Sequence, residues 1–186
     1  VNHDGVINAS DKVDLGNGLP KYTFGFNFSL AWKGFDLSAN FTGAAGFQIA
    51  QSYRDPSSSQ ANYSRRILKR WTGEGTSNEI PRVTYGDVGN WLFSDLYLQD
   101  GDYIRLQNLT MGYDFKKLIS WKGLSKMRLY FQVQNLFTLT KYDGMDPEIG
   151  SFNGTNGNSS DSWVSGVDMG YYPHPRTFIV GLNLAF

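Results

Sequence analysis

A short acidic stretch near the start of the chain has the residue types and spacing that a bound cation requires. The stretch NHDGVINASD resembles the calcium loop D-x-N-x-D-G-x-I-x-x-x-D from its third position onward. Asn2, Asp4 and Asp11 would supply side-chain oxygens and Val6 its backbone carbonyl. Hard oxygen ligands at alternate positions suit Ca²⁺.

Two further features of this stretch bear on the calcium interpretation. Gly5 would permit the sharp turn between the ligands. The first acidic ligand of the full motif would lie just before Val1, so we expect the sequence to start inside the motif. The site is therefore expected with its first ligand missing. The alternative is an ordinary Asn/Asp/Gly turn that holds no metal.

A second group of acidic residues lies in the last third of the chain. Asp143, Asp146 and Glu148 include pairs of carboxylates of the kind that cleave glycosidic bonds by acid–base catalysis. Nucleophilic catalysis has less support, because the chain has no cysteine and neither His3 nor His174 has neighbours that resemble a nucleophile–base pair. The stretch GEGTSN lacks the lysine of a phosphate-binding loop. The carboxylates are therefore the remaining candidates for catalysis among these residues.

The composition favours a β-sheet protein over a helical enzyme. Aromatic residues make up 16% of the chain, and charged residues make up 18%, which is below the usual value of about 25%. Basic and acidic residues balance at 17 each, so no net field attracts nucleic acid. No apolar run approaches the roughly 20 residues of a transmembrane helix.

Five segments show the alternation of apolar and polar residues that predicts β-strands, because successive side chains of a strand point to opposite faces. These segments are 22–32, 35–45, 103–115, 126–137 and 176–186. The first two flank Lys33-Gly34, a two-residue hairpin signal. The phase of the third is blurred between Leu106 and Leu109, where we expect a β-bulge.

The alternation sorts the side chains of these segments into two rows. The apolar row contains Phe24, Phe26, Phe28, Leu37, Phe41, Leu129, Phe131, Phe178, Val180, Leu182, Leu184 and Phe186. The polar row contains Gly25, Asn27, Ser29, Asp36, Ser38, Asn40, Arg128, Gln132 and Gln134. In an outer-membrane barrel the apolar row would face lipid and the polar row the lumen or a plug. In a soluble sandwich the apolar row would instead face a core.

The connections between the predicted strands alternate in length. The links after residues 32 and 115 are short, whereas 46–102 and 138–175 are long and lack regular alternation, apart from a short helix expected near Arg65–Trp71. Outer-membrane barrels have short periplasmic turns and long extracellular loops. If the C-terminus is periplasmic, both long loops are extracellular. This parity favours the membrane barrel, although five strands cannot close one, because the smallest barrels have eight.

With these features in place, the chain resembles the C-terminal part of the SusC/RagA-type TonB-dependent outer-membrane transporters. The matching stretches run in order over essentially the whole chain: NHDGVIN, LGNGLPKYTFGFNFSLAWKGFDLS, RWTGEGTSNEIPR, DGDYIRLQNLTMGYDF, QNLFTLTKYDGMDPE and GYYPHPRTFIVGLNLAF. The resemblance implies an all-β fold, the C-terminal strands of a 22-stranded antiparallel transmembrane barrel with a plug. It also implies TonB-driven uptake of glycan or peptide fragments beneath a SusD-type surface lipoprotein. Within this family, YDGMDPE implies a structural loop rather than a catalytic pair. We therefore expect a protein that is not an enzyme and has no organic cofactor.

The resemblance and the strand parity together assign a place to each part of the chain. We expect 1–21, 46–102 and 138–175 to be extracellular loops, 22–45 a β-hairpin, 103–137 two barrel strands with a periplasmic link, and 176–186 the barrel-closing strand. The expected location is the outer membrane of a Gram-negative bacterium, with a periplasmic C-terminus. The expected partners are lipid, the plug and other strands, the SusD-type lid and TonB, but not nucleic acid. Two alternatives remain: a soluble β-sandwich carbohydrate-binding module, or a small autonomous barrel of eight or more strands.

Overall fold

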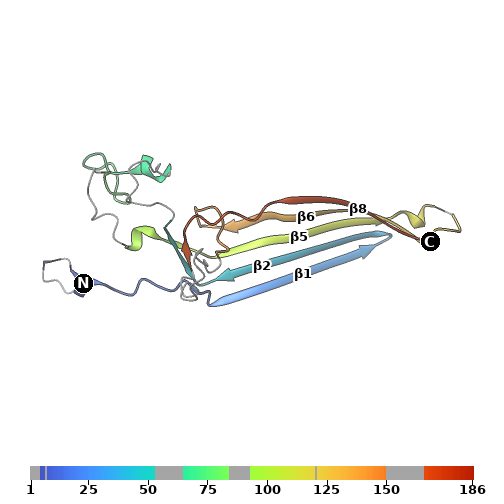
Figure 1. Ribbon diagram of the computed structural model, residues 1–186, viewed down its shortest axis with the longest axis horizontal. Helices are drawn as coiled ribbons and strands as arrows, with labels where there is room; N and C mark the ends of the chain where they lie inside the picture. The colour runs from blue at the N-terminus through green and yellow to red at the C-terminus, as the bar shows by residue number, and fades with distance from the viewer. Residues whose placement is uncertain (1–4, 7, 53–64, 84–92, 120, 150–165) are drawn as a thin grey trace, which may run out of the picture.

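The chain is an all-β protein built around one long antiparallel sheet. The computed structural model describes residues 5, 6, 8–52, 65–83, 93–119, 121–149 and 166–186. Within these residues the sheet has five strands in the order β1-β2-β5-β6-β8 (Figure 1). Each strand pairs with the next long strand along the chain, which makes an up-and-down meander. None of the described helices is long and apolar enough to cross a membrane.

The five long strands lie where the alternation of the sequence predicts them. They are β1 (Tyr22–Trp32), β2 (Phe35–Ala45), β5 (Tyr103–Asp114), β6 (Lys126–Thr140) and β8 (Thr177–Ala185). The main difference is that β6 continues beyond residue 137 to Thr140. The positions of the long strands therefore follow from local patterning in this part of the chain.

The predicted turn and the predicted bulge are both present. Lys33 and Gly34 have φ angles of 48° and 98° and join Trp32 to its partner Phe35, as a tight hairpin with two left-handed central residues does. Against β2, the pairing of β5 skips Gln107, which is the extra residue of a bulge. Against β6, Gln107 lies opposite two unpaired residues, Asn135 and Leu136. The bulge shifts the register, so the side chains of β5 keep the same faces as those of its neighbours on both sides of it.

The long segments 46–102 and 138–175 are not only loops. β3 (Gln48–Gln51) and β4 (Leu98–Asp100) join β7 (Val167–Asp168) in a second sheet of order β4-β3-β7. Four 3-10 helices also occur among the described residues: η1 (Ala9–Asp11), η2 (Arg65–Lys69), η4 (Asp95–Tyr97) and η5 (Phe115–Lys117). The helix expected near residues 65–71 corresponds to η2. Strands this short show no periodicity, and β7 comes from a distant part of the chain, so the sequence did not reveal this sheet.

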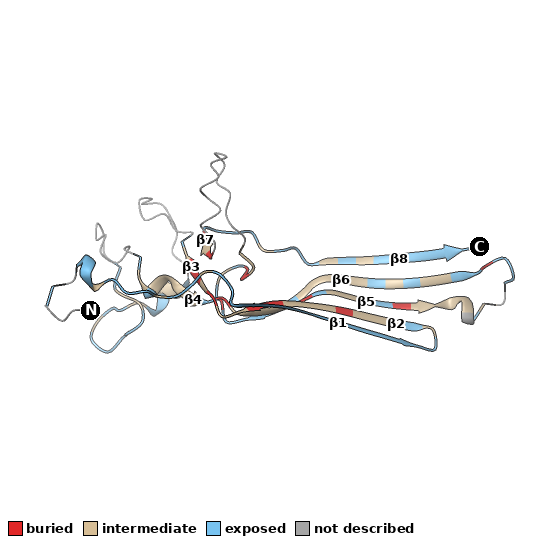
Figure 2. Cartoon of the chain, turned by 90° about the horizontal axis from the view of Figure 1, so that it is seen from below, coloured by how far each residue is buried: buried red, intermediate tan, exposed pale blue. Residues whose placement is uncertain are grey.

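Burial is concentrated where the two sheets meet. Ala44, Phe47, Ile49 and Tyr142 form a small core there. By contrast, β1 is exposed over all 11 of its residues, and β8 is largely exposed (Figure 2). Within the described residues no second layer covers the apolar face of the five-stranded sheet, and β1 and β8 each pair along one edge only. The described part of the chain therefore forms neither a β-sandwich nor a closed eight-stranded barrel.

Candidate functional site

One face of the five-stranded sheet carries polar residues across its strands, with Ile179 on β8 as an apolar exception. Residues paired across antiparallel strands share a face. Two rows of paired residues show the polar face: Asn27, Asn40, Asn108, Gln134 and Thr177, and Ser29, Ser38, Thr110, Gln132 and Ile179. Amide side chains bond across the strands, with Asn40 Nδ2 donating to Asn27 Oδ1 at 2.7 Å. The residues predicted as a polar row thus lie on one common face.

An ion pair crosses this polar face above a glycine. Arg128 on β6 donates through Nε to Asp36 Oδ1 on β2 at 2.8 Å, and its Nη2 bonds to the second oxygen of the same carboxylate. The strand between them carries Gly112, where an added Cβ would come within 2.6 Å of both partners. The Arg128 Cζ also lies 4.9 Å from the centroid of the Tyr130 ring. Gly112 therefore leaves open the space that the ion pair fills.

The opposite face of the sheet is apolar and exposed. Its side chains include those predicted as the apolar row, and Phe178, Val180 and Leu182 are 61%, 72% and 51% exposed. Rings on adjacent strands stack across this face, with the centroids of Phe131 and Phe178 6.2 Å apart. Exposed apolar surface that continues over five strands marks an interaction surface.

At the end of the sheet next to β3, β4 and β7, a buried arginine holds two segments together. Arg105 on β5 is 2% exposed and faces the polar side. Its Nη2 forms an ion pair with Asp146 Oδ1, and its Nη1 lies 2.9 Å from Glu148 Oε2. Its Nε donates to Thr138 Oγ1 on β6 at 3.0 Å. One guanidinium thus joins two strands of the sheet to the segment that follows β6.

Both oxygens of the Asp146 carboxylate accept hydrogen bonds from backbone N–H groups. The backbone N–H of Glu148 donates to its Oδ1 at 2.9 Å, and the backbone N–H of His174 donates to its Oδ2 at 3.1 Å. Burial alone would raise the pKa of Asp146. The N–H groups of Glu148 and His174 and the charge of Arg105 outweigh burial and hold the pKa of this carboxyl below its ordinary value. Asp146 is therefore an ionised anchor that joins the segment around His174 to the sheet.

A second buried carboxylate fastens β7 and the residues after it. Asp168 is fully buried and accepts a hydrogen bond from the Tyr142 hydroxyl through Oδ2 at 2.5 Å. The backbone N–H groups of Gly170 and Tyr171 donate to its Oδ1 at 2.8 and 2.9 Å.

Sequence reasoning missed Arg105, Tyr142 and Asp168. A single charged residue inside an alternating strand was a usable signal for Arg105, whereas nothing local marked the other two.

The three acidic residues considered for glycoside cleavage have separate structural partners. Asp146 and Glu148 both bind Arg105. Asp143 accepts from Gln51 Nε2 at 3.3 Å and lies 3.6 Å from Arg66 Nε, which links it to β3 and η2. Each of the three carboxylates is thus paired with an arginine, and Asp143 is paired with a different arginine from the other two. The geometry supports the interpretation of YDGMDPE as a structural loop.

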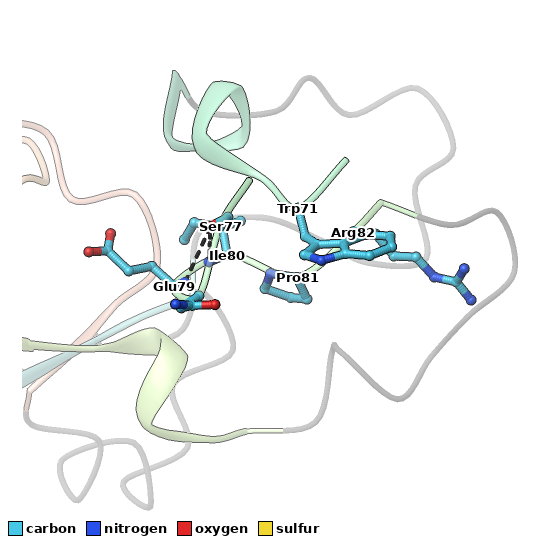
Figure 3. Close-up of a pocket in the computed structure, with 7 residues that line it drawn as sticks. Trp71, Ser77, Glu79, Ile80, Pro81 and Arg82 are labelled. Atoms are coloured by element: carbon cyan, nitrogen blue, oxygen red, sulfur yellow. Dashed lines mark hydrogen bonds between the residues drawn. The ribbon is translucent and has the colours of Figure 1, made fainter. Parts of the chain in front are cut away.

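The stretch after η2 folds into an open hollow (Figure 3). The residues that line it are Trp71, Ser77, Asn78, Glu79, Ile80, Pro81 and Arg82. The Trp71 N–H donates to the Ile80 carbonyl at 2.8 Å, and Ser77 Oγ accepts from the N–H groups of Glu79 and Ile80 at 3.2 Å. The hollow is built from one local segment and carries no catalytic arrangement.

The first half of the candidate calcium loop falls mainly outside the residues that the structure describes. Val1, before which the first ligand was expected, lies outside them, as do the expected ligands Asn2 and Asp4. Gly5 is described and has φ +81°, as the sharp turn requires. Gly5 therefore has a conformation that the predicted turn would need, while the ligands stay untested.

The second half of this loop contains η1. Asp11 Oδ2 accepts from the Asn8 N–H at 2.9 Å, within a capping box. Among the described residues no group of three or more His, Cys, Asp or Glu side chains could hold a metal ion. Calcium binding by Asn2, Asp4, Val6 and Asp11 stays a prediction.

The proteins similar to this chain in sequence are described as TonB-dependent receptors. The chain is 35% identical over 185 residues to TonB-dependent receptor P3 of Formosa agariphila, a match that covers 98% of this chain and 18% of the relative. It is 29% identical to TonB-dependent receptor SusC of Bacteroides thetaiotaomicron, over 100% of this chain and 17% of the relative. The chain thus spans less than a fifth of the length of these relatives. No family model matches it.

Solved structures show the same fold. The RagAB peptide importer in its open-open state superposes with a TM-score of 0.66 at 23% identity and covers 90% of this chain and 17% of the importer chain. In its closed-closed state the TM-score is 0.67 at 22% identity, with 98% of this chain and 20% of the importer chain covered. At this level of identity the likeness establishes the fold alone.

Proposed function

Since this chain belongs to the TonB-dependent receptors of the SusC/RagA type and spans a part of one, we propose that it forms the C-terminal strands and outer loops of an importer. The barrel would have 22 strands, and the cargo would be fragments of glycan or peptide. The apolar face of the five-stranded sheet carries the proposal, because its phenylalanine, leucine and valine side chains are exposed along whole strands. Water disfavours such a surface, whereas bilayer hydrocarbon solvates it.

The two faces of the sheet would then meet two environments. Strands β1 and β2 have 11 residues each, the length that a tilted strand needs to cross a bilayer. The apolar face would meet lipid, and the polar face would line the lumen and contact the plug. The free edges of β1 and β8 would pair with further strands of the same barrel, so that no edge is left open in the membrane.

The two ends of the sheet would lie on opposite sides of the outer membrane. The short links and the C-terminus lie together at one end, and β3, β4 and η2 lie at the other (Figure 1). We assign the short links to the periplasm and the long segments to the cell surface, where a SusD-type lipoprotein would cover them. TonB would act through the part of the transporter that contains the plug. The Arg105–Asp146 and Asp168–Tyr142 contacts would brace the surface segments during opening and closing of the lid.

Function on this proposal is binding and gating without bond chemistry. The RagAB neighbours are described as peptide importers, which supports peptide as one class of cargo.

Calcium would bind at Asn2, Asp4, Val6 and Asp11 in the outer loop and stabilise it. A calcium-dependent rise in melting temperature that Asp11→Asn abolishes and Asp14→Asn retains is the expected result. Equal responses of the two variants would contradict the calcium site.

Site-directed spin labelling tests the membrane assignment directly. The chain has no cysteine, so single cysteines introduced into the full-length transporter can be labelled individually once any others are replaced. Val180 and Ile179 are adjacent on β8 and point to opposite faces. In lipid vesicles, a label at 180 should collide mainly with oxygen, and a label at 179 mainly with a water-soluble nickel complex. Equal exposure of both labels to the nickel complex would refute the proposal.

A further inference from the structure

The end of the sheet that carries the short links is rich in lysine. Five of the nine lysines in the chain lie in or beside the two links: Lys33, Lys116, Lys117, Lys122 and Lys126. The links are close in space. The Asp114 N–H donates to the Gly34 carbonyl at 2.9 Å, and the Ser125 N–H donates to the Ala185 carbonyl at 2.7 Å. Figures 1 and 2 show the links and the C-terminus together at this end.

The acidic residues Asp36 and Asp114 at this end already have partners within the chain. Asp36 pairs with Arg128 on the polar face. Asp114 Oδ1 accepts from the backbone N–H groups of Lys116 and Met127 at 3.0 and 3.4 Å. Within the described part of the chain, the ion pairs do not include Lys33, Lys122 or Lys126, and these three side chains are exposed. We call these three lysines the basic end.

An aromatic collar lies directly beside the basic end. Trp32, Trp121 and Phe186 are 62%, 60% and 81% exposed. The Lys33 ammonium lies 5.0 Å from the centroid of the Trp32 ring, and the rings of Trp121 and Phe186 meet edge to face at 6.1 Å. Trp32 belongs to the last apolar row before the turn. Exposed tryptophans beside an apolar surface are typical of the level of lipid headgroups.

We propose that the basic end binds the phosphate groups of anionic phospholipids in the periplasmic leaflet of the outer membrane. The inference rests on the proposed membrane insertion of the sheet. If the apolar face ends at the aromatic collar, the ammonium groups just beyond it lie at the depth of lipid phosphates. Lysine is a compact point charge on a flexible stem, which suits a headgroup that has no fixed position. The collar at this level favours lipid over the acidic polymer of the cell wall as the partner.

Lipid retention by the intact transporter tests the proposal. The full-length protein is purified in mixed micelles that contain phosphatidylethanolamine and phosphatidylglycerol, and the retained lipids are counted by mass spectrometry. The wild-type protein should enrich phosphatidylglycerol over its share in the micelle, and less so in high salt. Each lysine at an anionic surface contributes a preference of roughly fivefold at most. The combined variant Lys33→Gln, Lys122→Gln, Lys126→Gln should lose enrichment by about tenfold or more.

Matched variants separate this charge effect from a general loss of charge. Lys12→Gln, Lys21→Gln and Lys141→Gln remove three lysines elsewhere in the chain and should retain the enrichment, as should replacement of the basic end by arginine. No enrichment by the wild-type protein, or an equal loss in both triple variants, would overturn the proposal. An unchanged lipid ratio with weaker sedimentation on isolated peptidoglycan would overturn it too and assign the basic end to the cell wall. These outcomes can be distinguished from a failure of membrane insertion, which the spin-label experiment tests alone.

Discussion

Replacing one residue of the apolar face by arginine would show whether that face meets lipid or water. Val180 is 72% exposed and lies in the middle of β8, opposite Phe131. Because so little of its side chain is buried by the chain itself, replacing it removes little packing. If the face meets water, Val180→Arg changes the free energy of unfolding by no more than about 0.5 kcal/mol. If the face meets the middle of a bilayer, the change costs about 2–4 kcal/mol.

The assay is unfolding of the full-length transporter from lipid vesicles by urea, followed by tryptophan fluorescence. A loss of about 2–4 kcal/mol lowers the ratio of folded to unfolded protein by about 30- to 700-fold and shifts the midpoint to lower urea. Ile179→Arg is the matched control, because residue 179 is on the same strand at the same depth but faces the polar side with Gln132. Equal and small effects of the two variants would refute the assignment of the apolar face to lipid.

Three further predictions concern the polar side. Arg105→Met leaves the buried Asp146 carboxylate without its main cation and should lower the local free energy of unfolding by about 3–5 kcal/mol. Faster hydrogen exchange in residues 141–149 would measure this loss. Adding Asp146→Asn should recover part of it. Because the pKa of Asp146 is lowered on folding, its contribution to stability is present above the ordinary value of 3.8 and lost as the pH falls through the folded value. Proteolysis near residue 146 should therefore rise only below pH 3.8 and not between pH 5 and 7. Gly112→Val should displace Arg128 from Asp36 and destabilise the sheet, whereas Thr110→Val, on the same strand and face, should have a smaller effect in the urea assay.

Much of the five-stranded sheet was predictable because its determinants are local. Alternation along β1 and β2 sets both the strand and its faces, and Lys33-Gly34 sets the turn and register between them. The blurred phase between Leu106 and Leu109 indicated a bulge, which the structure places at Gln107 in the pairing of β5 with β2. The assignment of the polar and apolar rows also followed, because in a strand the face of a side chain depends only on whether its position is odd or even.

The contacts at the end of the sheet next to β3, β4 and β7 could not be predicted in this way. Arg105 meets Asp146 and Glu148 only because β5 and the segment after β6 end side by side. Asp168 is buried because β7 pairs with β3, which comes from a distant part of the chain. Neither pairing leaves a periodic trace, since strands of two to four residues are too short to show one.

The sequence by itself determined the all-β fold class, the long strands and which residues share a face. Each of these depends on residue order within one strand or turn. Tertiary structure alone decided which charges meet. Gly112 is an ordinary strand glycine in the sequence, yet in the sheet it is the gap through which Arg128 reaches Asp36. The lysines of two separate links became one basic end for the same reason. Contacts between strands are set by pairing and register, and no single segment contains that information.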